Sequence, residues 1–237
     1  MKFRPFRVHV GTMEKLRGDV VLWLDEEART GAEHMAVDEW LLSRSAAPVL
    51  RIYQWPEGFG SIGYFCNLTV ARCLYPDIRF VRRRTGGGIV DHRNDWTYSL
   101  VVPRGEPLAT ARGGESYETI HLALSRTLAA EGVETLAHAG GANACVADCF
   151  LNPVPADLLN SYGRKIAGAA QWRSSGRLLH QGSVAMPCDA GKSVARSRRL
   201  LSELAPVWHA ETLAPSAAVI ADIAARRYDS PEWANRR

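Results

Sequence analysis

Cys149 and Lys165 are the residues of this chain best suited to covalent or electrostatic catalysis. Cys149 opens a Cys-Phe pair in a loop-like, proline-containing stretch, 16 residues before Lys165. A cysteine becomes a nucleophile when a positive neighbour lowers the pKa of its thiol, but most unpaired cysteines are simply small buried residues. Both interpretations of Cys149 are open on these grounds, because the sequence does not tell which charges lie beside it in space.

Lys165 lies in the strand-like stretch GRKIAGAAQWR, between polar residues and a run of apolar and small ones. Burying a charge is costly, so a lysine in such a place often serves as a compact positive charge near a carbonyl or phosphate. Gly168 removes side-chain bulk close by and leaves room for a ligand. The alternative is an edge-strand lysine whose ammonium group reaches water.

The run RRRTGGG at 82–88 combines guanidinium donors with three glycines. Glycine lets a ligand approach the backbone closely, and consecutive N–H groups in such a turn can form an anion site. The spacing matches neither a Walker loop nor a dinucleotide-binding fingerprint. A glycine-rich hairpin between two strands is the alternative.

The elements that must position these residues are mixed helices and strands. Strand-like segments are separated by short Gly, Pro and Asn signals, which favours antiparallel pairing and an α+β fold over a doubly wound one. We expect a mixed, largely antiparallel sheet flanked by helices. The predicted strands are 18–24, 49–55, 61–65, 78–83, 96–102, 158–162, 165–172 and 177–186, and the predicted helices are 33–44, 116–131 (capped by Ser116) and a helical region around 210–228.

Composition excludes several classes of protein. The 237 residues are 46% hydrophobic and 23% charged, which is typical of a globular protein. A net charge of +4 suits an acidic partner or an anionic cofactor but is too low to indicate nucleic-acid binding. No apolar run approaches the ~20 residues of a membrane span, so we expect a cytoplasmic protein with its five cysteines as thiols. Cys145 and Cys149 lack matching ligands nearby, so no metal site is predicted.

Taken together and in this order, these segments resemble the lipoate ligase and octanoyltransferase family of the biotin and lipoyl protein ligase superfamily. The stretches HMAVDEWLL at 34–42 and PVLRIYQWPEGFGSIGYFCN at 48–67 add to the resemblance. It implies a catalytic fold shared with biotin protein ligases and class II synthetase cores. We therefore predict a single catalytic domain over residues 1–228 and a frayed tail over residues 229–237.

The resemblance also implies roles for particular residues. Lys165 would contact the acyl carbonyl or an adenylate phosphate, and Cys149 would carry the acyl group. The acidic partner expected after the loop histidine is Asp91 or Asp95. The residues that would line the substrate site are Arg83, Thr85, Gly86, Gly87, Gly88, His92, Gly168, His180, Gly182 and Ser183.

Three functions are compatible with this resemblance. The Cys149-Phe150 pair favours a cofactor-free octanoyltransferase, which takes octanoate from acyl carrier protein. Its acceptor would be a lysine of a lipoyl domain or of the glycine-cleavage H protein. Arg84 and the third loop glycine are closer to the ligases, so a compact lipoate ligase using ATP and magnesium is the alternative. The third is an inactive protein that only binds the carrier domain.

Overall fold

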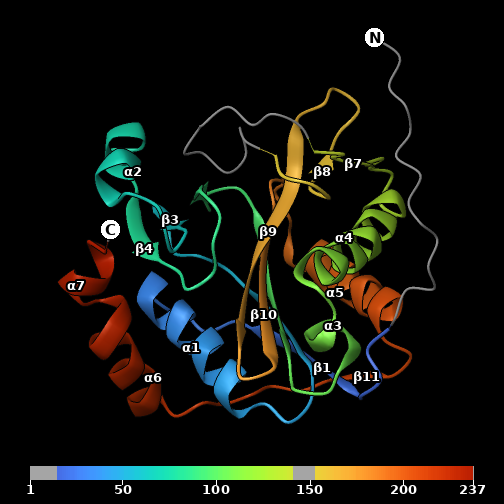
Figure 1. Ribbon diagram of the computed structural model, residues 1–237, viewed down its shortest axis with the longest axis horizontal. Coiled ribbons are helices and arrows are strands. Elements are labelled where there is room, and N and C mark those ends of the chain that lie inside the picture. Colours follow the sequence, from blue (N-terminus) through green and yellow to red (C-terminus); the bar gives the residue numbers. More distant parts are fainter. Residues whose placement is uncertain (1–14, 141–152, 237) are drawn as a thin grey trace.

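The computed structural model describes residues 15–140 and 153–236, which build an eight-stranded sheet, a three-stranded sheet and flanking helices (Figure 1). The large sheet has the order β11-β1-β2-β6-β10-β9-β8-β7. Pairs β11–β1 and β1–β2 are parallel, and the other five are antiparallel. Its strands are β1 (Val20–Asp25), β2 (Val49–Tyr53), β6 (Trp96–Val102), β7 (Leu136–Ala137), β8 (Leu158–Leu159), β9 (Lys165–Ser174), β10 (Arg177–Val184) and β11 (Trp208–Ala210). The expected α+β fold with a mixed, largely antiparallel sheet is confirmed.

The helices lie on both sides of this sheet (Figure 1). They are α1 (Gly31–Arg44), α2 (Leu68–Leu74), α3 (Pro107–Thr110), α4 (Gly113–Ala129), α5 (Ala190–Leu204), α6 (Ala217–Ile223) with its π-helical continuation η1 (Ala224–Tyr228), and α7 (Pro231–Ala234). Helices α4 and α5 cover one face, and α1 and α6 cover the other. Among the described residues, no helix is both long and apolar enough to cross a membrane.

Alternation along the strands divides the core into two layers. Val20 and Leu22 of β1 pack with α4 and α5, whereas Val21 and Trp23 pack with α1 and α6. Successive side chains of a strand point to opposite faces, so one apolar strand supplies both layers. The site described below lies on the α1 face.

The three-stranded sheet has the order β4-β3-β5 and covers part of the α1 face. Its strands are β3 (Phe59–Ile62), β4 (Arg79–Arg82) and β5 (Ile89–Asp91). Strand β3 pairs with β4 in parallel and with β5 antiparallel, so residues around 61, 82 and 90 are brought side by side. The loop 83–88 connects β4 to β5 and is therefore held at both ends.

Two helix boundaries differ from the expected ones because capping groups outweigh the apolar pattern. Helix α1 begins at Gly31, where Thr30 and Glu33 form a reciprocal capping box. Helix α4 begins at Gly113, and Ser116, the predicted cap, is a buried residue inside it. The Ser116 hydroxyl donates instead to the Gly113 carbonyl and to Gln171.

The chain end also differs from the predicted frayed tail. Residues Pro231–Ala234 form α7, and the indole N–H of Trp233 donates to the Arg82 carbonyl at 2.9 Å. Arg82 in turn donates to the carbonyls of Trp233 and Ala234, both at 2.9 Å. These long-range bonds tie the last helix to β4, and no local pattern in the sequence could have indicated them.

Candidate functional site

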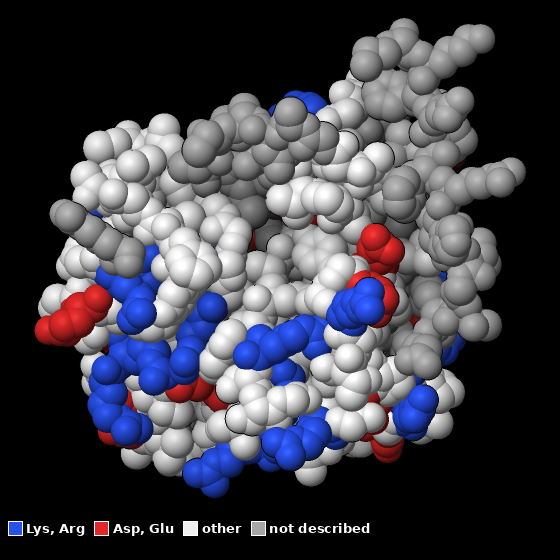
Figure 2. Space-filling model, viewed as in Figure 1, with Lys and Arg blue, Asp and Glu red and all other residues white. Residues whose placement is uncertain are grey.

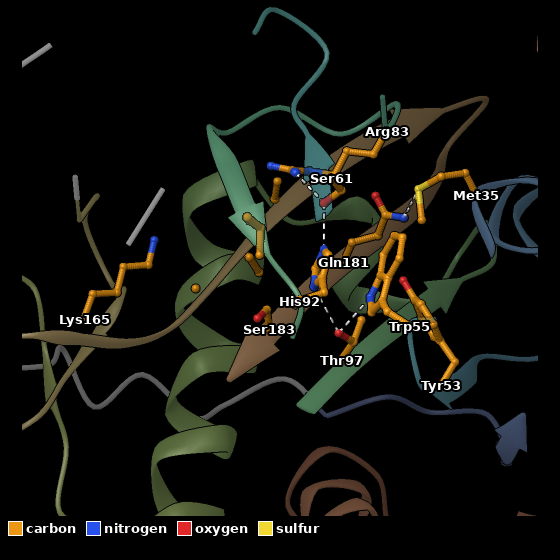
Figure 3. Close-up of a pocket in the computed structure, with 15 residues that line it drawn as sticks. Met35, Tyr53, Trp55, Ser61, Arg83, His92, Thr97, Lys165, Gln181 and Ser183 are labelled. Atoms are coloured by element: carbon orange, nitrogen blue, oxygen red, sulfur yellow. Dashed lines mark hydrogen bonds between the residues drawn. The ribbon is translucent and has the colours of Figure 1, made fainter. Parts of the chain in front are cut away.

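A cavity lies between the α1 face of the large sheet and the three-stranded sheet (Figure 3). Apolar and aromatic residues form one end, and polar residues of both sheets form the middle. Lys165 stands at the opposite end, apart from Met35 and Tyr53. The lining residues are Met35, Tyr53, Trp55, Ser61, Arg83, Val90, His92, Thr97, Lys165, Gly168, Ala169, Ala170, Gln181, Gly182 and Ser183.

Arg83 is the residue that the RRRTGGG loop contributes to the cavity. Its guanidinium donates to the carbonyls of Gly86 and Gly88, both at 2.9 Å, and to the Ser61 hydroxyl at 2.9 Å. The loop therefore wraps its carbonyl oxygens around the arginine. Arg83 is the residue of this loop that lines the cavity.

The two neighbouring arginines have different contacts. Arg82 donates to the carbonyls of Gly63, Tyr64 and Cys66, which fixes the turn after β3. Arg84 lies 3.9 Å from the centre of the Trp172 ring and pairs with Glu39 of α1 at 3.3 Å. Three consecutive arginines thus tie the loop to three different parts of the fold.

His92 lies between a hydroxyl and a carboxylate. Its Nε2 is 2.8 Å from the Ser61 hydroxyl, and its Nδ1 is 2.7 Å from Asp95. The imidazole stacks on Trp55, with ring centres 4.1 Å apart and planes 6° apart. Of the two candidate acidic partners, Asp95 contacts the histidine, whereas Asp91 pairs with exposed Arg93.

Asp95 is the centre of a larger group of hydrogen bonds. It accepts from Ser183 at 2.5 Å and from Thr97 at 3.0 Å. The Trp55 indole N–H in turn donates to the Thr97 hydroxyl at 3.1 Å. Ser183 and Thr97 belong to paired strands β10 and β6, so the large sheet sets the position of this carboxylate.

Lys165 is buried and paired rather than directed to water. Its side chain is 1% exposed, and its ammonium lies 2.7 Å from the carboxylate of Asp157, which is fully buried. Asp157 also accepts from the Tyr117 hydroxyl at 2.6 Å and from the Val154 N–H at 2.7 Å. Burial, and secondarily Asp157, raise the pKa of Tyr117 well above its usual value, so this phenol stays a donor.

Gly168 is required by the close approach of Lys165. A Cβ at residue 168 would lie 2.3 Å from Cε and 2.4 Å from Nζ of the lysine. Real Cβ atoms essentially never come so near, so any side chain here would displace the ammonium group. The spacing of Lys165 and Gly168 in β9 is thus a direct steric requirement.

Of the twelve predicted site residues, five described ones do not line the cavity, and a sixth, Cys149, lies outside the described residues. Thr85 is one of the five, and it donates to the side chain of Gln181, a lining residue, at 2.7 Å. His180 lies on the opposite face of β10, against Tyr98 and Gln171. Alternate residues of a strand point to the same face, so His180 shares the face of Leu178. Gly86 and Gly88 contribute carbonyls that accept from Arg83, and the Gly87 carbonyl accepts from Cys66 at 3.2 Å.

The other six predicted residues all line the cavity: Arg83, His92, Lys165, Gly168, Gly182 and Ser183. The site also contains residues that were not predicted, namely Ser61, Thr97, Gln181 and the Lys165 partner Asp157. Only Asp157 carried a usable signal, because a carboxylate in the apolar stretch ADLL must find a partner when buried.

Comparison with known proteins assigns the family. The chain matches the lipoyl protein ligase A/B catalytic domain over residues 30–205, and it belongs to that family. It is 34% identical over 179 residues to the octanoyltransferase LipM of Carboxydothermus hydrogenoformans. That match covers 72% of this chain and 66% of the relative, so the chain spans slightly less than two thirds of that protein's length.

Solved structures show the same fold. A bipartite lipoate protein ligase of Thermoplasma acidophilum, studied with its E2 lipoyl domain, superposes with a TM-score of 0.68 at 18% identity. That match covers 92% of this chain and 96% of the other. A lipoate-protein ligase A bound with ATP superposes with a TM-score of 0.69 at 19% identity, covering 91% and 98%.

Proposed function

We propose that this protein transfers an octanoyl group from acyl carrier protein to a lysine of a lipoyl carrier domain. The observation that carries the proposal is the buried Lys165 ammonium, held by Asp157 at one end of a cavity whose other end is apolar and aromatic. Such a site suits a medium-length acyl chain with its carbonyl near a fixed positive charge. The octanoyltransferase relative supports the choice of acyl group.

In this proposal Cys149 is the nucleophile. Its thiolate attacks the thioester carbonyl of octanoyl-carrier protein, the bond from the carbonyl carbon to the donor sulfur breaks, the donor leaves as a thiolate, and an octanoyl thioester forms on the enzyme. The neutral amine of the acceptor lysine then attacks that thioester, the carbon–sulfur bond to Cys149 breaks, an amide forms, and the departing sulfur takes up the proton that the amine loses. Lys165 stabilises the negative charge on the carbonyl oxygen in both steps. The reaction needs no cofactor.

The charge of the surface supports an acidic carrier as partner. Figure 2 shows Lys and Arg side chains gathered over the region of α1, α6 and α7 and the adjoining ends of β9 and β10. Few acidic side chains lie between them on this face. A lipoyl domain or the glycine-cleavage H protein would be attracted to such a face, and so would acyl carrier protein.

Two further features accompany the proposal. We place one catalytic domain over residues 1–228, since the family match falls inside it. The described cysteines, Cys66, Cys73 and Cys188, are free thiols, which supports a reducing, cytoplasmic setting.

A compact lipoate ligase using ATP and magnesium is the second candidate. The observation in its favour is the fold of the ATP-bound lipoate-protein ligase A together with Arg84 and Gly88 in the loop. In that case Lys165 would contact the adenylate phosphate. A protein that only binds the carrier domain is the third, and a buried, paired lysine in a cavity argues against it.

Intact mass spectrometry separates the three functions. The protein is incubated with octanoyl-acyl carrier protein without ATP, and the expected result is an octanoyl adduct that is absent in Cys149→Ala. ATP-dependent lipoylation of a lipoyl domain, without any such adduct, would replace the transferase by the ligase. If a folded protein shows neither reaction but binds the carrier domain, both enzymatic functions are excluded.

A further inference from the structure

The contacts of Ser61, His92 and Asp95 have only one consistent direction when His92 is neutral. A guanidinium only donates, so the Ser61 oxygen accepts from Arg83 at 2.9 Å. A carboxylate only accepts, so His92 Nδ1 carries the hydrogen that points to Asp95 at 2.7 Å. His92 Nε2 is then an acceptor, and the Ser61 O–H must donate to it at 2.8 Å.

This order of groups is that of a hydrolase triad. A serine hydroxyl donates to one nitrogen of a histidine, and a buried carboxylate accepts from the other nitrogen and holds the ring in the tautomer needed for base catalysis. Such triads are recognised by geometry and roles, because they occur on unrelated folds with unrelated residue orders. Both distances lie within the ~2.6–3.2 Å in which a general base can act.

His92 and Asp95 are buried and are contacted by neighbouring side chains. The side chains of His92 and Asp95 are 5% and 3% exposed. Trp55 stacks on the imidazole, and Ser183 and Thr97 donate to the carboxylate. Catalytic groups need this kind of fixed orientation, since a small misplacement greatly reduces the rate.

We propose that Ser61, His92 and Asp95 form a second nucleophilic site, which accepts a medium-chain acyl group from a thioester or an activated ester and hydrolyses it. Ser61 and His92 both line the cavity, so an acyl carbonyl held there reaches the hydroxyl. Met35, Tyr53 and Val90 line the same cavity and provide the apolar surface for the chain. The Arg83 guanidinium lies 2.9 Å from the attacking Ser61 oxygen and is the positive charge that would stabilise the carbonyl oxygen, on which negative charge develops.

The reaction consumes one water molecule. Ser61 Oγ forms a bond to the carbonyl carbon, its proton passes to His92 Nε2, the carbon–sulfur bond breaks, and the leaving thiol takes that proton. Water then attacks the serine ester, His92 removes a proton from the water, and the carbon–oxygen bond to Ser61 breaks as the serine regains its proton. The products are the free fatty acid and the thiol.

The test uses the full-length Cys149→Ala protein, so that no thioester can form at residue 149. It is incubated with p-nitrophenyl octanoate, and release of p-nitrophenol, intact mass and peptide masses are followed. The expected result is an octanoyl ester on the peptide containing Ser61 that survives neutral hydroxylamine, which cleaves thioesters. Adding Ser61→Ala or His92→Gln should slow p-nitrophenol release by about 10²-fold or more.

Ser99→Ala is the matched control, because Ser99 is also a fully buried serine whose hydroxyl donates to a carboxylate, that of Asp38 at 2.7 Å. In the Cys149→Ala background it should form the ester at the parental rate. Absence of an octanoyl group from the Ser61 peptide would overturn the proposal, as would an equal loss in Ser99→Ala. The experiment with octanoyl-acyl carrier protein detects the adduct that depends on Cys149, whereas this one detects the ester on Ser61. The proposed transfer and the proposed hydrolysis can therefore be refuted independently.

Discussion

At the scale of single residues, the proposed chemistry of the cavity depends on where one ammonium group and one imidazole are held. Lys165 is held by Asp157 and by the absence of a side chain at Gly168. His92 is held by Asp95, Ser61 and Trp55. Both arrangements consist of buried polar groups that hold one another in place, so a change in one partner should affect activity and stability together.

Asp157→Asn should lower the free energy of unfolding by about 3 kcal/mol or more, because the buried Lys165 ammonium loses its carboxylate. Urea unfolding measures the change. The double variant Asp157→Leu/Lys165→Met should recover much of that stability while losing transfer activity, because the pair is removed as a unit. If the changes in free energy of unfolding for Asp157→Leu and Lys165→Met simply added in the double variant, the two residues would not act as a buried ion pair.

Gly168→Ala should reduce octanoyl transfer by about 10²-fold, because the new Cβ displaces the Lys165 ammonium. Transfer to a purified lipoyl domain measures the rate. Gly113→Ala is the control, since a Cβ there meets no atom within 4 Å. An unchanged rate in Gly168→Ala would show that the position of the ammonium does not matter for transfer.

At the scale of elements, the site is assembled where two sheets meet. Strand β10 contributes Gln181 and Ser183 to the cavity, while the same strand sends His180 into the opposite layer. Gln181 donates to Asp38 of α1 and accepts from Thr85, so one side chain links helix, sheet and loop. The loop therefore depends on the packing of α1 as well as on its own glycines.

Trp233→Ala should lower the free energy of unfolding by about 2 kcal/mol, because α7 would lose its packing and its indole bond to the Arg82 carbonyl. The turn that Arg82 holds after β3 should loosen as well. Thermal unfolding measures the effect. Glu232→Ala, an exposed change in the same helix, should be nearly neutral. A Trp233→Ala protein as stable as the Glu232→Ala protein would contradict the prediction.

At the scale of the whole molecule, three buried histidines make the fold sensitive to acid. Burial is the main cause in each case. It lowers the pKa of His34 to about 2, with Arg51 adding to the effect, lowers that of His121 to about 4, and lowers that of His180 well below its usual value. All three are therefore neutral in the folded protein at pH 7 and protonate more readily when it unfolds.

The sign of the pH dependence follows from proton uptake. Between pH 6.5 and 4 the unfolded chain binds more protons at His121 than the folded one does, so its contribution to stability is full above pH 6.5 and declines as the pH falls toward 4. His121→Leu should remove up to about 3 kcal/mol of this acid-induced loss. Urea unfolding at a series of pH values measures the free energy of unfolding of the parent protein and of His121→Leu. The same pH dependence in both proteins would contradict the prediction.

Much of the fold was predictable from the sequence because its signals are local. The strands around 20, 50, 100 and 180 and the first long helix follow from short apolar patterns, and their number and kind indicated an α+β fold. The first residues of α1 and α4 were misplaced, whereas the last residue of α1 was predicted correctly, because N-caps depend on hydrogen bonds rather than on apolar spacing.

The order of the motifs along the chain was enough, by itself, to indicate the family and to single out Arg83, His92 and Lys165. Only the tertiary structure decided that Asp95 rather than Asp91 contacts His92, that Asp157 holds Lys165, and that His180 faces the other layer. The physical reason is that other elements decide these contacts: His92 and Asp95 are only three residues apart, but Thr97 of β6 and Ser183 of β10 hold the Asp95 carboxylate in place, and the surroundings of Lys165 and His180 come from distant segments. Which side chains meet is set by strand register and by which face of the sheet each helix covers, and neither is a property of any short stretch of sequence.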